Sequence, residues 1–270
     1  MKRVFLFFLM LPTSNFGETV GFKLHDGYLI VVKCSVGDLR DLTALVDTGV
    51  TETTLDARIA KRLGLTTRPD TATFGTHDAG VQAISIPHIA FGPLNAENLA
   101  GIAIDLSPLT HRLGIRPDAL IGMDVLRQGR FVIDYRARTI TFDNLPKLLH
   151  SGTLIAHTRF ALVAAQAEGK SLRLQVDTGF NAILIYGNRL RLVAGGKMDA
   201  HSGTFGRDLN SRPGSVSQLN IGDWKGKQII VYETDEEPLG QVEFDGLLGP
   251  AAIGIHRLAF DFEQGTMSWD

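Results

Sequence analysis

The tripeptide Asp-Thr-Gly occurs twice in the chain, at residues 47–49 and 177–179, and each copy ends an apolar run. The copies lie 130 residues apart (177 − 47). One such tripeptide is expected by chance in roughly one chain in twenty of this length, and a single aspartate there would cap a turn. Two carboxylates brought together cannot both ionise cheaply, so they keep one proton between them. Such a pair can act as base and acid on one water molecule.

The repeat extends well beyond the two tripeptides. Residues 118–142 align with residues 245–269 without a gap, and Thr-Phe-Gly at residues 73–75 recurs at 204–206. Within residues 118–142 and 245–269, the identical pairs are Asp118/Asp245, Leu120/Leu247, Gly122/Gly249, Arg130/Arg257, Asp134/Asp261 and Thr139/Thr266. The repeated aspartates among these pairs are expected to have structural roles in turns. A duplication of this kind predicts two similar lobes that face each other across a pseudo-twofold axis.

Short strands dominate the predicted secondary structure. Apolar runs and turn signals over residues 27–46 predict a hairpin that delivers Asp47 into a turn. A short amphipathic helix is predicted over residues 55–63, and residues 66–80 are predicted to be a looser polar region. The second half repeats this order, so we predict an all-β fold with a few short helices. The predicted lobes are residues 18–145 and 146–270.

The composition excludes several classes of protein. The 270-residue chain is 44% hydrophobic and 21% charged, and its net charge of −2 gives no electrostatic basis for binding nucleic acid. Cys34 is the only cysteine, which rules out an internal disulfide and a cysteine-based zinc cage. The histidines show no metal-binding spacing, and the sequence lacks a dinucleotide or phosphate-binding fingerprint. No metal and no cofactor are expected.

The N-terminus has the pattern of an export signal. Lys2 and Arg3 form a short basic region, and residues 4–11 form an apolar region that is too short to be a stable membrane anchor. We predict a signal peptide over residues 1–17 and a periplasmic or secreted protein.

The paired motifs resemble the aspartic peptidases of the pepsin and retropepsin superfamily, in the bacterial form in which one chain carries two tandem retropepsin-like units. Each half has a hairpin into Asp-Thr-Gly, a flap region, and an apolar segment that ends in glycine, at residues 119–122 and 246–249. The resemblance covers nearly all of residues 27–269. It implies a bilobal fold of two β-barrel halves and a protein or peptide substrate bound in the cleft between them.

The resemblance also assigns roles to individual residues. Asp47 and Asp177 would be the catalytic pair, and Thr48 and Thr178 would hydrogen-bond across the axis. The glycines expected to allow close packing are Gly49 and Gly179 beside the carboxylates and Gly122 and Gly249 under the active loops. The residues expected in flap-like loops are Phe74, Gly75, Phe205 and Gly206.

Two departures from the family pattern bear on function. The residue after each Asp-Thr-Gly is Val50 or Phe180, where the family usually has a small residue, and no flap tyrosine is found. We predict a monomeric aspartic endopeptidase. One alternative is a peptide-binding or regulatory protein of the same fold that lacks catalysis. Another is an enzyme whose halves pair with a second chain.

Overall fold

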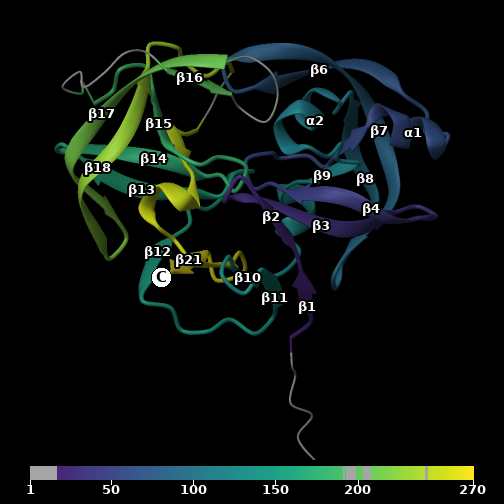
Figure 1. Ribbon diagram of the computed structural model, residues 1–270, viewed down its shortest axis with the longest axis horizontal. Coiled ribbons are helices and arrows are strands. Elements are labelled where there is room, and N and C mark those ends of the chain that lie inside the picture. Colours follow the sequence, from purple (N-terminus) through teal and green to yellow (C-terminus); the bar gives the residue numbers. More distant parts are fainter. Residues whose placement is uncertain (1–16, 191, 193–198, 203–207, 241–242) are drawn as a thin grey trace, which may run out of the picture.

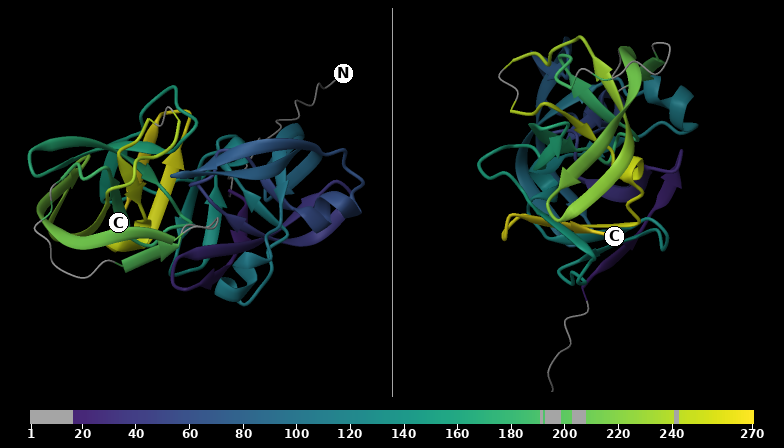
Figure 2. Two further views of the ribbon diagram at one scale, coloured as in Figure 1. Left: turned by 90° about the horizontal axis from the view of Figure 1, so that it is seen from above. Right: turned by 90° about the vertical axis from the view of Figure 1, so that its left-hand side faces the viewer.

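The structure is a computed structural model that describes residues 17–190, 192, 199–202, 208–240 and 243–270. It has one sheet in each lobe and a third sheet to which both lobes contribute. The two lobes lie side by side (Figure 2). Phe205, Gly206 and all of the predicted signal peptide except Gly17 lie outside the described residues. Within the described ranges, no helix has the length and apolar character needed to cross a membrane.

The N-terminal lobe is built on an eight-stranded sheet in the order β2-β3-β4-β9-β5-β8-β7-β6, which a further pairing of β3 with β7 closes into a barrel. Its strands are β2 (Lys23–His25), β3 (Leu29–Val36), β4 (Leu39–Val46), β5 (Thr54–Asp56), β6 (Arg68–Phe74), β7 (His77–Phe91), β8 (Leu94–Ile104) and β9 (Ala119–Ile121). Its helices are α1 (Ala57–Arg62), α2 (Pro108–Leu113) and α3 (Met123–Leu126).

The C-terminal lobe repeats this plan with a seven-stranded sheet in the order β13-β14-β19-β15-β18-β17-β16, and β13 also pairs with β17. Its strands are β13 (Leu162–Ala167), β14 (Lys170–Val176), β15 (Ile183–Tyr186), β16 (Asp199–Ser202), β17 (Asp208–Ile221), β18 (Trp224–Thr234) and β19 (Gly246–Leu248). The 3-10 helix η1 (Pro250–Ile253) follows β19, as α3 follows β9 in the first lobe.

A six-stranded sheet in the order β1-β11-β10-β20-β21-β12 joins the lobes at the bottom of Figure 1. Its strands are β1 (Thr19–Gly21), β10 (Phe131–Asp134), β11 (Thr139–Phe142), β12 (His150–Thr153), β20 (Arg257–Asp261) and β21 (Thr266–Trp269). At its centre β10 pairs with β20, which places Phe131 of one lobe opposite Phe260 of the other. Both rings are fully buried and their centroids lie 5.6 Å apart. One hydrophobic core therefore runs through both halves.

The all-β prediction is confirmed, and two local predictions are wrong. The predicted helix at residues 55–63 is shorter, because fully buried Leu55 belongs to strand β5 and Asp56 caps α1 by accepting a hydrogen bond from the Arg58 amide (2.9 Å). The predicted polar loop at residues 66–80 is the regular β6–β7 hairpin. Within the part of the chain that the structure describes, β6 is an edge strand without a partner on one side, and it has no buried residue, so its sequence shows no apolar alternation.

Candidate active site

Each Asp-Thr-Gly motif follows a strand in the middle of its lobe. Strand β4 leads into Asp47 and β14 leads into Asp177, and each strand pairs in parallel with a short strand that precedes a glycine, β9 or β19. The Asp47 amide donates to the Ile121 carbonyl (3.1 Å), and the Asp177 amide donates to the Leu248 carbonyl (3.0 Å). The apolar segments that end in glycine therefore fix the start of both motif loops.

The two threonines of the motifs bind the loops to each other. The Thr48 hydroxyl donates to the Val176 carbonyl (2.7 Å) and accepts from the Thr178 amide (3.0 Å). The Thr178 hydroxyl does the reverse, donating to the Val46 carbonyl (3.0 Å) and accepting from the Thr48 amide (3.0 Å). Both threonines are fully buried. These four reciprocal hydrogen bonds set the position of one lobe's motif relative to the other.

The two motif glycines let the carboxylates approach each other. A Cβ atom on Gly49 would lie 2.5 Å from the Asp177 carboxyl group, and one on Gly179 would lie 2.8 Å from Oδ2 of Asp47. Each glycine also donates its amide hydrogen to the aspartate of its own motif, Gly49 to Asp47 (2.8 Å) and Gly179 to Asp177 (2.7 Å). Any larger residue would push a carboxylate out of place.

The carboxyl groups of Asp47 and Asp177 share one environment. Asp47 is 2% exposed and Asp177 is partly exposed. Burial raises the pKa of Asp177 well above its usual range, and the negative charge of Asp47 and a hydrogen bond with its side chain raise it further. The hydrogen bond from the Gly179 amide opposes this pKa shift. The pair is therefore set up to hold one proton at a pH where an ordinary aspartate has lost its own.

Gly122 and Gly249 lie beneath the motif loops. A Cβ atom on Gly122 would lie 3.1 Å from the Val50 carbonyl oxygen, and one on Gly249 would lie 2.4 Å from the Phe180 carbonyl oxygen. Val50 packs against the apolar cluster of the first lobe, and Phe180 is buried in that of the second. Each lobe therefore accommodates its unusual residue through its own apolar packing.

The β6–β7 hairpin forms a flap that reaches over the motif loops to the C-terminal lobe (Figure 1). At its tip Gly75 has a left-handed backbone (φ +61°), and its carbonyl accepts a hydrogen bond from the Leu239 amide (2.9 Å). A Cβ atom on Gly75 would lie 3.5 Å from the Tyr186 hydroxyl. The flap is therefore closed onto the opposite lobe. The second proposed flap, with Phe205 and Gly206, lies outside the described residues.

A cavity of about 550 Å³ lies between the motif loops and the flap, lined by both aspartates and by the flap residues 70–77. The second lobe supplies an apolar wall of Phe160, Phe180, Leu184, Tyr186, Phe244 and Leu247. The first lobe supplies mainly polar side chains, Thr51, Glu52, Thr54, Asp70, Thr71 and Thr73. The two sides of the cavity therefore differ in chemistry although the motifs beneath them match.

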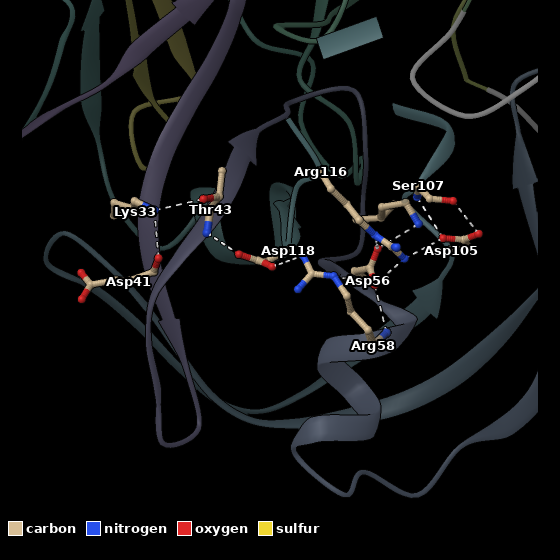
Figure 3. A network of polar contacts seen from close by, with 10 residues as sticks. Lys33, Asp41, Thr43, Asp56, Arg58, Asp105, Ser107, Arg116 and Asp118 are labelled. Carbon is tan, nitrogen blue, oxygen red and sulfur yellow. Dashed lines mark hydrogen bonds and ion pairs between the residues drawn. The ribbon is translucent and has the colours of Figure 1, made fainter. Parts of the chain in front are cut away.

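A polar network surrounds Asp56, at the end of β5 in the first lobe (Figure 3). The fully buried carboxylate of Asp56 accepts hydrogen bonds from the amides of Arg58 (2.9 Å) and Leu106 (3.1 Å). It also accepts hydrogen bonds from both Nε (2.9 Å) and Nη2 (3.1 Å) of Arg116. These bonds tie β5, the start of α1 and the end of β8 together behind the cavity.

Asp118 and Asp245 have matching roles in the two lobes. Asp118 accepts from the Thr43 amide (2.7 Å) and forms an ion pair with Arg58. Asp245 accepts from the Arg173 amide (2.8 Å) and lies 3.2 Å from Nε of Arg189. Each aspartate therefore joins the strand that carries a motif to the segment that supports it, which is the structural role expected for both.

Two residues of the cavity wall were not singled out from the sequence. Gln175 is 2% exposed, and its side-chain amide donates to the Gly49 carbonyl in the opposite lobe (2.9 Å). Tyr186 is equally buried and lies beneath the flap tip. A polar residue in the apolar run before Asp177 was a visible signal for Gln175, whereas only the three-dimensional structure brings Tyr186 to the flap.

Comparisons with known proteins agree with this geometry. The family model for aspartyl proteases matches residues 32–125, which include the first Asp-Thr-Gly, the flap and Gly122. A comparison with curated proteins found no match. The match covers the first lobe, and the second lobe repeats its strand order and its motif loop. This match to the first lobe supports a pepsin- and retropepsin-like family of aspartic peptidases for the chain.

Proposed function

We propose that this protein is an aspartic endopeptidase in which Asp47 and Asp177 form the catalytic pair. The observation that carries the proposal is the meeting of these two carboxyl groups in one cavity, with the pKa of Asp177 raised and a hydrogen bond between the side chains. The match of residues 32–125 to the aspartyl protease family model supports a protease role in general.

The proposed mechanism needs only the two carboxyl groups and a water molecule. The ionised carboxylate takes a proton from the water as its oxygen attacks the peptide carbonyl carbon. The protonated carboxyl group donates its proton to the carbonyl oxygen, which stabilises the tetrahedral intermediate. Collapse of this intermediate transfers a proton to the leaving nitrogen and breaks the C–N bond. The reciprocal threonine bonds keep both carboxyl groups in position throughout.

The flap supports an extended peptide as the substrate. Residues 70–74 of β6 all line the cavity, and among the described residues β6 is an edge strand that no other strand pairs with on its outer side. An extended peptide can pair with such an edge and place alternate side chains in pockets. At the tip, the hydroxyl of Thr76 is buried and has no hydrogen-bond partner among the described residues, so it is suited to a polar group of the substrate.

We also propose that the enzyme is an exported monomer. One chain supplies both motifs, and the threonine bonds and the six-stranded sheet join its halves, so a second chain is not needed to complete the pair. Export is supported by the basic and apolar residues at positions 2–11 of the sequence. Sedimentation velocity and the N-terminal sequence of protein recovered from a periplasmic or secreted fraction test these two points.

The catalytic proposal is tested by the cleavage of a random peptide library at pH 4, 5.5 and 7, with and without a statine-type inhibitor. Asp47→Asn and Asp177→Asn are each expected to lower kcat/KM by at least about 10²-fold, because the pair can then no longer supply both a base and an acid. Asp41→Asn is the matched control, since Asp41 lies exposed on the same strand β4 and Asn tolerates its left-handed backbone (φ +55°).

Each outcome of this test has a distinct meaning. Cleavage by the wild type and Asp41→Asn that disappears in both dyad variants supports the endopeptidase. Full activity in either dyad variant contradicts it. Peptide binding by the folded wild type without cleavage at any pH would instead indicate the peptide-binding alternative, with Val50 and Phe180 as the residues to replace next.

A further inference from the structure

The wall beside Asp177 contains a polar side chain that has no counterpart in the first lobe. Gln175 lies two residues before Asp177 on β14, so both side chains are on the same face of the strand. Leu45 has the same position before Asp47, but it packs into the apolar cluster of its lobe and does not line the cavity. The duplicated strands therefore present different chemistry at matching positions.

The amide of Gln175 is only partly used within the protein. One side-chain N–H group donates to the Gly49 carbonyl (2.9 Å), and the side chain makes no other hydrogen bond with the described residues. A primary amide has two N–H donors and one carbonyl acceptor. One donor and the acceptor are therefore left for a ligand, in a cavity wall where the sheet neighbours of Gln175 are the apolar Leu247 and, next to it, Leu184.

The bond to Gly49 also fixes the orientation of this amide. Because the Gly49 carbonyl can only accept, the side-chain nitrogen must face it, and the side-chain oxygen is directed elsewhere. The side chain is 2% exposed and so has little freedom to move away. A substrate that covers this wall without a hydrogen-bonding group would leave a desolvated donor and acceptor unsatisfied, which is unfavourable.

We infer that Gln175 is a specificity-determining residue that reads the substrate residue lying against the C-terminal lobe. It selects an uncharged side chain with both donor and acceptor groups, an amide or a hydroxyl, over an apolar side chain of equal size. The apolar wall around it disfavours a charged side chain, which would lose its hydration there. This inference rests on the proposed peptidase function.

The test compares the cleavage-site profiles of the wild type and Gln175→Met, which keeps the length of the side chain and removes its amide. In the wild type, one position next to the scissile bond should be enriched in Asn, Gln, Ser or Thr. In Gln175→Met the same position should shift to Leu and Met, while the other positions keep their profile. Gln218→Met is the matched control, because Gln218 is exposed on β17 and outside the cavity.

A second measurement uses the wild type alone and stays decisive if Gln175→Met fails to fold. Two peptides that differ only in Gln or Met at the selected position should differ in kcat/KM by about 3- to 10-fold in favour of Gln. Equal rates for the two peptides would overturn the inference. So would a uniform loss of activity in Gln175→Met without a change of profile, because that result indicates a purely structural bond to Gly49.

The failure of this inference can be told apart from the failure of the proposed function. If the wild type cleaves the library and Asp177→Asn does not, the function stands and the profiles decide the role of Gln175. If the wild type cleaves nothing at any pH, the proposed function fails and the inference falls with it.

Discussion

The two lobes keep the same motif loops but differ in the strand that follows each loop. In the first lobe β5 ends at Asp56, whose buried carboxylate caps α1 and holds Arg116. In the second lobe β15 ends at Tyr186, at the matching position 130 residues later, and Tyr186 lies beneath the flap tip. Burial raises the pKa of the Tyr186 phenol, and the charge of Asp177 adds to this, so the hydroxyl remains a donor.

This difference shows which parts of two lobes with the same strand order are free to differ. The motif loops must match, because each loop positions the carboxylate and the threonine that the other loop needs. The strand ends that follow the loops take no part in these reciprocal hydrogen bonds. One could therefore become a structural anchor and the other a part of the cavity wall.

The largest expected effect tests the equivalence of the motif loops. Gly49→Ala and Gly179→Ala should each lower kcat/KM by about 10²-fold or more, because the new methyl group displaces a carboxyl group. The loss should be greater for Gly49→Ala, whose Cβ would lie 2.5 Å from Asp177, against 2.8 Å between Gly179 and Asp47. Steady-state kinetics measure this. Gly21→Ala is the control, since nothing lies within 4 Å of its Cβ position; wild-type rates in both motif variants would disprove the equivalence.

The next effect tests the divergence of the strand ends. Asp56→Ala should lower the free energy of unfolding by about 3 kcal/mol, because it removes a buried carboxylate that accepts hydrogen bonds from three residues. Urea denaturation measures the change.

Tyr186→Phe should alter stability far less and mainly change the KM. Asp105→Ala is a second comparison, since Asp105 also contacts Arg116 (2.8 Å) but is exposed, and only a small change is expected.

A smaller effect is expected from the threonines that join the loops. Thr48→Val and Thr178→Val should each destabilise the protein by about 2 kcal/mol, since each removes one donor and one acceptor from a buried reciprocal set. The two losses should be equal within about 0.5 kcal/mol. Thr→Ser at either position should restore most of the stability because the hydroxyl is kept. A large inequality would mean that one lobe supports the joint more than the other.

The smallest effect is the pH dependence of stability that Asp177 adds. Its pKa is raised in the folded protein, mainly by burial, so folding favours the protonated form. This contribution to stability is fully present below the pKa that Asp177 has in the unfolded chain. It is lost as pH rises from that value through the pKa that Asp177 has in the folded protein. The free energy of unfolding should therefore fall as pH rises over that range, with a slope that corresponds to the release of at most one proton per molecule. In Asp177→Asn the free energy of unfolding should depend less on pH. An unchanged slope in Asp177→Asn would contradict the assignment.

The activity of the wild type should fall over the same window. Catalysis needs one proton on the pair, and that proton leaves as pH passes the raised pKa of Asp177. A rate profile between pH 3 and 8, measured with one peptide, shows whether the alkaline limb coincides with the change in stability.

The sequence predicts the parts of the site that chemistry restricts to particular residue types. Aspartate, threonine and glycine recur in a fixed order because a carboxylate, a hydroxyl bridge and the absence of a Cβ atom are all needed. The β6 strand could not be predicted, because an edge strand that borders a cavity has no buried face to give its sequence an apolar alternation. The contact of Gly75 with Leu239 could not be predicted either, since it joins loops of different lobes that share no sequence signal.

The roles of wall residues depend on geometry between the lobes. Gln175 and Leu45 occupy equivalent positions, yet only Gln175 lines the cavity and reaches the opposite lobe. Sequence shows that one is polar and the other apolar, but not which of them faces a ligand. That distinction depends on how far each lobe wall stands from the flap, a property of the assembled protein.

The six-stranded sheet has a consequence for the synthesis of the protein. Its central pairing joins β10 to β20, and one of its inner strands, β21, ends at Trp269. A ribosome must therefore release the chain through Trp269 before the sheet that holds the lobes together can be completed. Until then this sheet cannot hold the two motif loops against each other, so the proposed catalytic pair would become fixed only late in synthesis.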